Sequence, residues 1–202
     1  MSHSGPVSAA LTISLAALVA VWPSAGQAQA WQEYANLDYR FSTMFPGEPS
    51  VRDFSYTTAN GVLVPAREFR AERGEGRYSM TVVDFSAHES EEDGAIAHAA
   101  AAIRQKGTPR YDEFAQLNGI PGHALSIVEP DGRQILSSIY LHDHRLYIAE
   151  GSEAAESLPP ALFSQSTDIT DEHGVGINLN PGGATSRAQL LRQQQEAEQQ
   201  QQ

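Results

Sequence analysis

The chain lacks cysteine altogether, since none occurs among its 202 residues. This absence excludes disulfide bonds, thiolate nucleophiles, cysteine metal ligands and the lipidated cysteine that anchors a bacterial lipoprotein. No Asn-x-Ser/Thr sequence is present, so the chain offers no acceptor for N-linked glycans. A domain outside the cytoplasm that has no disulfides must be held together by its buried core, and this chain is long enough to form one.

Basic residues are scarce relative to acidic ones. The chain has 13 Lys and Arg residues against 25 Asp and Glu residues, which gives a formal net charge of −12 at pH 7. Such a charge repels nucleic-acid phosphates and anionic lipid surfaces, so we expect neither as a partner. It permits cationic partners or divalent ions, and it also favours solubility.

Recognisable catalytic sequences are missing as well. The chain contains no Gly-x-Ser-x-Gly elbow and no Ser-x-x-Lys sequence, which are typical of serine hydrolases and β-lactamases. The glycine pairs at 74–76 and 174–176 are too short for phosphate loops and stand beside acidic residues. We therefore expect no cofactor and lean towards a protein that is not an enzyme.

One long apolar run is present, at residues 9–22, and it carries no charge. It is shorter than the roughly 20 apolar residues of a membrane-spanning helix, and Pro23 follows it. The small-residue sequence Ala28-Gln29-Ala30 follows in turn, which is typical of a signal-peptidase site. We predict a signal peptide over residues 1–30, cleaved before Trp31, although no Lys or Arg precedes the run. An uncleaved single-pass tether is the alternative.

Export places the mature protein in the periplasm of a Gram-negative bacterium or in the medium, and both the missing glycan acceptor and the missing cysteines fit this location. Residues 31–179 have the composition of a single folded α+β domain. Residues 180–202 differ, because Pro181, Gly182 and Gly183 break regular structure and the remainder is rich in glutamine. We expect this tail to be disordered or a fraying helix. After cleavage no membrane span is expected.

Period-two alternation and turn residues predict most of the strands. Asn60-Gly61 suits a tight hairpin turn, and Pro130-Asp131-Gly132 is a second strong turn sequence. The predicted strands are 34–45, 51–58, 62–71, 77–85, 123–128, 133–141, 145–150 and a short edge strand at 166–170.

Two helices are predicted between these strands. The first covers 92–106, with Ser90 as N-cap, acidic residues in its first turn and a stripe of small apolar side chains for packing on a sheet. The second is a short helix within 153–164 that begins near Pro159 and Pro160. Strands and helices segregated in this way predict an antiparallel β-sheet flanked by helices, an α/β/α sandwich of the α+β class.

The segment Tyr39–Pro49 resembles a family of uncharacterised exported bacterial proteins. It contains the pattern Phe-x-x-x-Phe-Pro-x-x-Pro, formed here by Phe41, Phe45, Pro46 and Pro49. The order of elements is similar to that of PsbP-like domains. This resemblance implies an antiparallel sheet between helices, and it transfers no catalytic residue.

The sequence His142-Asp143-His144 is the sharpest candidate site. Two histidines at i and i+2 on one strand project to the same face, where they could bind zinc with Asp143 or Asp131 completing the set. The same triplet also fits a solvated turn between two strands, because turns collect His and Asp.

Two further polar segments attract attention. His173 with Asp171 or Glu172 could provide acid–base chemistry, but a glycine-containing loop accounts for the same residues. The acidic segment 88–93 lacks the spacing of a calcium loop, and helix capping explains it better.

Three hypotheses about function follow. The first is a non-enzymatic, monomeric periplasmic domain that binds an unknown protein or small molecule through the sheet face or through a cleft between sheet and helix. The second is a metal-binding protein or metal-dependent enzyme that uses His142, Asp143 and His144. The third is an envelope structural protein whose C-terminal tail finds a partner.

Overall fold

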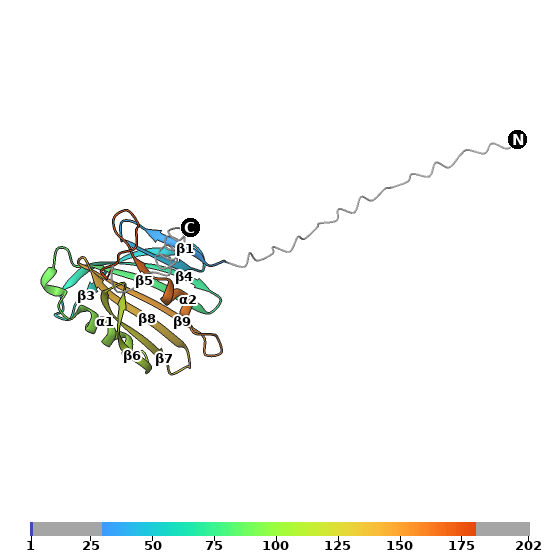
Figure 1. Ribbon diagram of the computed structural model, residues 1–202. Helices are drawn as coiled ribbons and strands as arrows, with labels where there is room; N and C mark the ends of the chain where they lie inside the picture. The colour runs from blue at the N-terminus through green and yellow to red at the C-terminus, as the bar shows by residue number, and fades with distance from the viewer. Residues whose placement is uncertain (2–29, 181–202) are drawn as a thin grey trace, which may run out of the picture.

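A computed structural model describes Met1 and residues 30–180. The described residues form a seven-stranded antiparallel sheet of order β3-β4-β5-β9-β8-β7-β6 and a three-stranded sheet of order β1-β2-β10 (Figure 1). The strands are β1 (Gln32–Asn36), β2 (Phe41–Phe45), β3 (Ser50–Thr57), β4 (Leu63–Arg73), β5 (Gly76–Asp84), β6 (Thr108–Leu117), β7 (Ile120–Val128), β8 (Gln134–His142), β9 (Arg145–Glu153) and β10 (Asp168–Ile169). The helices are the 3-10 turn η1 (Glu89–Glu91), α1 (Ala95–Arg104) and α2 (Ala161–Ser166).

One face of the large sheet is covered by α1. Ala99, Ala100 and Ile103 of the helix are buried, together with side chains of β7, β8 and β9 such as Leu125 and Leu146. The small alanine side chains let the helix axis come close to the strands. This confirms the prediction that the helix packs on the sheet through a stripe of small apolar residues.

The opposite face is covered by the small sheet together with α2. Phe41 and Phe45 of β2, Phe69 of β4 and Phe163 of α2 are fully or almost fully buried there and form one apolar cluster. The ring centroids of Phe41 and Phe69 lie 5.0 Å apart, which is the spacing of an edge-to-face aromatic pair. The large sheet is thus buried on both faces.

The predicted α/β/α sandwich is therefore wrong. Strands dominate the described residues, and the layer opposite α1 is a second antiparallel sheet with a helix of six residues. Pro159 and Pro160 restrict that helix to the segment after them, because proline cannot donate a helical hydrogen bond.

The segment 34–45, predicted as one strand, is a hairpin instead. β1 pairs antiparallel with β2, and residues 37–40 form the turn between them. Asn36 Oδ1 accepts a hydrogen bond from the Tyr39 amide at 3.0 Å, and Arg40 has a φ of 53°. The Asn36 side chain thereby stabilises a turn that period-two alternation does not reveal.

Strand β6 has no counterpart in the sequence prediction. It is an edge strand, and most of its side chains are exposed, so no apolar alternation marks it. Asn118 and Gly119 form the turn that joins it to β7, with φ values of 51° and 91°. These values fit a two-residue hairpin turn. The Asn-Gly pair in the sequence could therefore have indicated that a strand, β6, precedes it as well as the strand β7 that follows it.

The remaining predicted strands and helices are confirmed with shifted bounds. β3 and β4 pair antiparallel across the Asn60-Gly61 turn, as predicted. Helix α1 begins at Ala95 rather than near residue 92, because the 3-10 turn η1 and Gly94, with a φ of 74°, precede it. Ser90 lies within η1 and does not cap α1.

The signal peptide predicted over 1–30 lies outside the described residues except for Met1 and Ala30, and the tail predicted over 180–202 does so except for Asn180. Both stay predictions, as do the domain boundaries. None of the helices in the described residues has the length and apolar character that crossing a membrane would require.

Candidate functional site

The predicted metal ligands lie where β8 turns into β9. His142 ends β8 and pairs with Arg145, whereas Asp143 and His144 are the two residues of the turn. Their φ values of 47° and 60° are typical of a type I′ hairpin turn. The two histidines are therefore not placed at i and i+2 of one strand, and the solvated-turn interpretation describes their backbone correctly.

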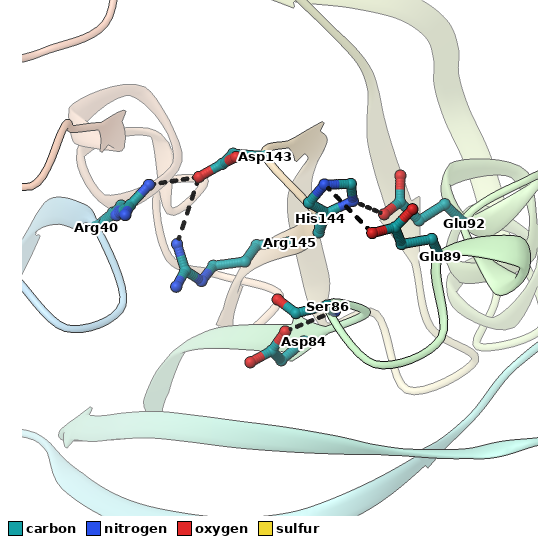
Figure 2. A network of polar contacts seen from close by, with 8 residues as sticks. All are labelled: Arg40, Asp84, Ser86, Glu89, Glu92, Asp143, His144 and Arg145. Carbon is teal, nitrogen blue, oxygen red and sulfur yellow. Dashed lines mark hydrogen bonds and ion pairs between the residues drawn. The ribbon is translucent and has the colours of Figure 1, made fainter.

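Asp143 joins this turn to the small sheet. Its carboxylate forms an ion pair with Arg40, which lies in the turn between β1 and β2 (Figure 2). The same carboxylate lies 3.9 Å from Nη1 of Arg145. Asp143 is thus neutralised by two guanidinium groups from two different segments of the chain.

His144 joins the turn to the segment that precedes α1. Its Nδ1 lies 2.5 Å from Oε1 of Glu92, and its Nε2 lies 4.0 Å from Oε1 of Glu89 (Figure 2). The hydrogen bond to Glu92 raises the pKa of His144 above its ordinary value, with a smaller contribution from the charge of Glu89. Protonation of His144 therefore strengthens its contact with the acidic segment.

Asp143 and His144 consequently point to different partners. Asp131 lies in the β7–β8 turn, at the other end of β8, where its carboxylate accepts a hydrogen bond from the Arg133 amide at 3.0 Å. Within residues 30–180 no group of three or more His, Asp or Glu side chains is arranged to hold a metal ion. Metal binding by His142, Asp143 and His144 stays a prediction, and metal analysis of the protein purified without a histidine tag would test it.

The other two polar segments form local structure. Asp171 Oδ1 accepts hydrogen bonds from the amides of His173 and Val175, at 2.8 and 2.9 Å, which is the pattern of an Asx turn. In the acidic segment, Glu91 Oε2 contacts the hydroxyl of Thr58 at 2.5 Å and so ties η1 to the β3–β4 turn.

A cleft of about 500 Å³ lies beside α1, between the helix and the strands beneath it. We call it the α1 cleft. One wall comes from residues 92–94, which precede α1, and from Ala95, Ile96, Ala97 and Arg104 of the helix. The strands contribute His123 of β7 and Leu141 of β8. Ile96 and Leu141 line the cleft and are half-buried, so apolar side chains are partly open to solvent there. Its volume is within the range of small-ligand sites.

One end of the α1 cleft is acidic. Glu92 and Asp93 lie there, and the carboxylate of Glu92 is in contact with the imidazole of His144. Asp93 is exposed and forms no ion pair with another residue of the described region. The contact with His144 shown in Figure 2 thus fixes the position of the Glu92 carboxylate at this end of the cleft.

The other end holds a coupled triad of charged and polar side chains. Arg104, in the last turn of α1, donates a hydrogen bond from Nη2 to Oδ1 of Asp112 at 2.8 Å, and His123 Nε2 contacts the same carboxylate. The Arg104 guanidinium holds the pKa of Asp112 well below its usual range, and His123 lowers it further. This triad ties the helix to the edge strand β6 and closes the cleft at that end.

An exposed aromatic residue stands next to the α1 cleft. Phe114 of β6 is 67% exposed and lies directly opposite His123 in the β6–β7 pairing, so both side chains are on the sheet face that carries α1. With Ile96 and Leu141 it extends the apolar surface from the cleft towards the edge of the sheet.

Arg104, Asp112, His123 and Leu141 were not among the residues that the sequence analysis selected. They come from α1, β6, β7 and β8, so nothing in their spacing indicates that they meet. The hypothesis of binding through a cleft between sheet and helix named none of these residues, and binding there stays a prediction.

Comparisons with known proteins yield a structural neighbour. No protein-family model matches the chain, and no curated protein matches it. Among solved structures, it is similar to the solution structure of cyanobacterial PsbP (CyanoP) from Synechocystis sp. PCC 6803. The two share 13% sequence identity with a TM-score of 0.45, over 75% of this chain and 98% of that one. The resemblance to exported proteins with the Phe-Pro pattern stays a prediction.

Proposed function

We propose that this protein is a non-enzymatic, exported binding domain whose α1 cleft receives a segment of a partner protein. The observation that carries the proposal is the cleft itself: apolar side chains stay open to solvent between a helix and a sheet, and polar groups mark its two ends. Exposed apolar surface of this kind is typical of interaction sites.

The charges favour a basic partner segment. The cation at one end, Arg104, is already neutralised by Asp112, whereas Asp93 at the other end has no ionic partner within the described residues. The net charge of −12 adds a long-range attraction for cations. A segment that combines apolar side chains with lysine or arginine therefore complements the cleft better than an acidic one does.

Two matched peptides test this function on the full chain without the signal peptide. Each has about twelve residues in which leucine alternates with lysine in one peptide and with glutamate in the other. We expect the lysine peptide to shift the amide resonances of Ile96, Ala97, His123 and Leu141, because these residues line the α1 cleft.

The glutamate peptide should leave those resonances unchanged at the same concentration. Amide shifts scattered evenly over the acidic surface would mean that the lysine peptide binds by charge alone, and they would contradict the proposal. Equal shifts with both peptides would contradict the charge preference.

Export is a separate part of the proposal, supported by the uncharged apolar run at 9–22 and the following Ala28-Gln29-Ala30. N-terminal sequencing of the protein recovered from the periplasm should begin at or near Trp31. A mature chain that retains residue 9 onwards would favour the tethered alternative.

A further inference from the structure

A second cavity lies on the same face of the sheet as α1, where the helix has ended. Its volume is about 340 Å³, and we call it the sheet-face groove. Lys106, two residues after α1, forms part of its rim, and its floor comes from β4, β5, β9 and β8. Unlike the α1 cleft, it is lined mainly by charged and hydroxyl side chains.

The register of the four strands aligns a polar row across the floor of this groove. Arg70 of β4 is opposite Ser79 of β5, Ser79 is opposite Glu150 of β9, and Glu150 is opposite Ser137 of β8. Residues opposite one another in antiparallel strands project to the same face, so these four side chains share it. A sheet face that is apolar under α1 therefore becomes polar beyond the helix.

Ser137 is the unusual member of this row. It is 1% exposed, and its Oγ has no hydrogen-bond partner within residues 30–180. Buried hydroxyl groups are seldom left without a partner. Its strand neighbour Ile135 and its cross-strand neighbour Glu150 both line the groove, so Ser137 lies next to the lining residues without itself being one of them.

Most charges that line the groove are already paired. Lys106 Nζ lies 2.5 Å from Glu150 Oε2, and Arg70 Nη2 lies 2.6 Å from Glu72 Oε1. Glu68 likewise pairs with Arg52, which lies on the edge strand β3.

Two charges of opposite sign remain. Arg77 forms no ion pair with any other residue of the described region, and the nearest cation to Glu129 is Arg133, at 4.0 Å. The groove therefore presents one open guanidinium and one weakly paired carboxylate.

We propose that the sheet-face groove binds a small zwitterion of the amino-acid or short-peptide class. The ligand carboxylate pairs with Arg77, whose planar guanidinium suits a bidentate contact, and its ammonium group pairs with Glu129. Ser152, which lines the groove directly opposite Arg77 in the β5–β9 pairing, lies between the two charges, and Ser79 and Glu150 form the next row along the strands. This site is separate from the α1 cleft, and it does not depend on the function proposed for that cleft.

Glycylglycine and its two blocked forms test this assignment. N-acetyl-glycylglycine lacks the ammonium charge, and glycylglycinamide lacks the carboxylate. We expect glycylglycine to shift the amide resonances of Ser79, Glu150 and Ser152, which line the groove, and we expect each blocked form to bind at least about tenfold more weakly. Absence of binding at about 10 mM glycylglycine, or equal binding of all three compounds, would overturn the proposal.

Variants with matched charge changes locate the site. Arg77→Gln and Glu129→Gln should each weaken glycylglycine binding at least about tenfold, because each removes one ionic contact. Arg110→Gln and Glu113→Gln make the same charge changes on the exposed edge strand β6 and should leave binding unchanged. An equal loss of glycylglycine affinity in the groove variants and in the β6 control variants would show that net charge, and not the groove, controls binding. Ala97→Trp, which fills the α1 cleft, should leave glycylglycine binding intact.

Discussion

Gly122 shows how strongly single positions constrain the large sheet. It lies on β7 opposite Tyr140, and a Cβ atom at this position would overlap the Tyr140 ring and the carbonyl oxygen of Ile139. The contact with backbone cannot be relieved by a side-chain rotation. Glycine at this position leaves the space beside β7 that the Tyr140 ring occupies.

We therefore expect Gly122→Ala to lower the free energy of unfolding by about 3 kcal/mol, as overpacking of a buried site does. Urea unfolding of the variant and of Ser126→Ala measures the difference. Ser126 lies on the same strand and the same face but is half-buried, so its variant should stay within about 0.5 kcal/mol of the parent. Similar stabilities of the two variants would show that the sheet adapts to a methyl group at position 122.

The pKa of Asp112 reports whether the triad at the end of the α1 cleft is formed. Arg104 is the main cause of its lowered pKa, and His123 is the second. In Arg104→Gln we expect the pKa of Asp112 to rise towards its ordinary value of about 4, measured by NMR titration of the carboxyl carbon.

The consequence for stability has a definite sign. A carboxyl with a lowered pKa stabilises the folded state above its unfolded pKa, and this contribution is lost as the pH falls through the folded pKa. Arg104→Gln should therefore reduce stability at neutral pH and change it little under strongly acidic conditions. A variant whose Asp112 titrates as in the parent would contradict the triad.

At the scale of elements, the β8–β9 turn connects three parts of the molecule. Asp143 contacts the small sheet through Arg40, and His144 contacts the segment before α1 through Glu92 (Figure 2). The turn thus fixes Glu92 at the acidic end of the α1 cleft. At the other end, Arg104 ties α1 to β6 through Asp112.

This connection predicts a pH-dependent effect. Because the pKa of His144 is raised in the folded state, its interaction with Glu92 stabilises the fold below the unfolded pKa of about 6.5 and is lost as the pH rises through the folded pKa. His144→Gln should lower the thermal unfolding midpoint more at about pH 5 than at about pH 9. In a Glu92→Gln background that pH dependence should disappear, and its persistence would assign the effect to another group.

Helix α2 is short, so its docking depends on tertiary contacts. Phe163 is fully buried, with its ring centroid 5.1 Å from that of Phe45 and 5.6 Å from that of Tyr78. We expect Phe163→Ala to cost about 3–5 kcal/mol of unfolding free energy. Hydrogen exchange should show that protection is lost first at the amides of β1, β2 and β10, because these strands form the layer against which α2 packs. Uniform loss of protection across both sheets would indicate that the layers unfold as one unit.

Elements with alternating apolar residues and glycine turns were predictable from sequence, and β3, β4 and β5 are examples. β6 was not, because an edge strand with polar residues on both faces has no apolar period. The β1–β2 turn was not either, because it depends on the Asn36 side chain rather than on glycine. At the site, the sequence indicated His142-Asp143-His144 because these polar residues are adjacent in the chain. Arg104, His123 and Leu141 of the cleft are far apart in the sequence and come together only in the folded sheet.

At the scale of the whole molecule, the large sheet carries an apolar layer on each face, which accounts for a cysteine-free domain. α1 covers one face in part, so the α1 cleft flanks the helix and the sheet-face groove lies beyond its end. The two cavities differ in chemistry because the same face changes from apolar to polar along the strands. The molecule therefore has two separate cavities on this face, one with apolar side chains open to solvent and one lined mainly by charged and hydroxyl side chains.

The most direct test of the α1 cleft as a binding site compares two tryptophan variants of α1. Ala97 is exposed and lines the cleft, whereas Ala102 is exposed and does not, so Ala97→Trp fills the cleft and Ala102→Trp adds the same side chain elsewhere without changing the net charge. Calorimetric titration with the leucine–lysine peptide should show at least about tenfold weaker binding to Ala97→Trp and unchanged binding to Ala102→Trp. Unchanged binding to both variants would contradict the assignment of the cleft.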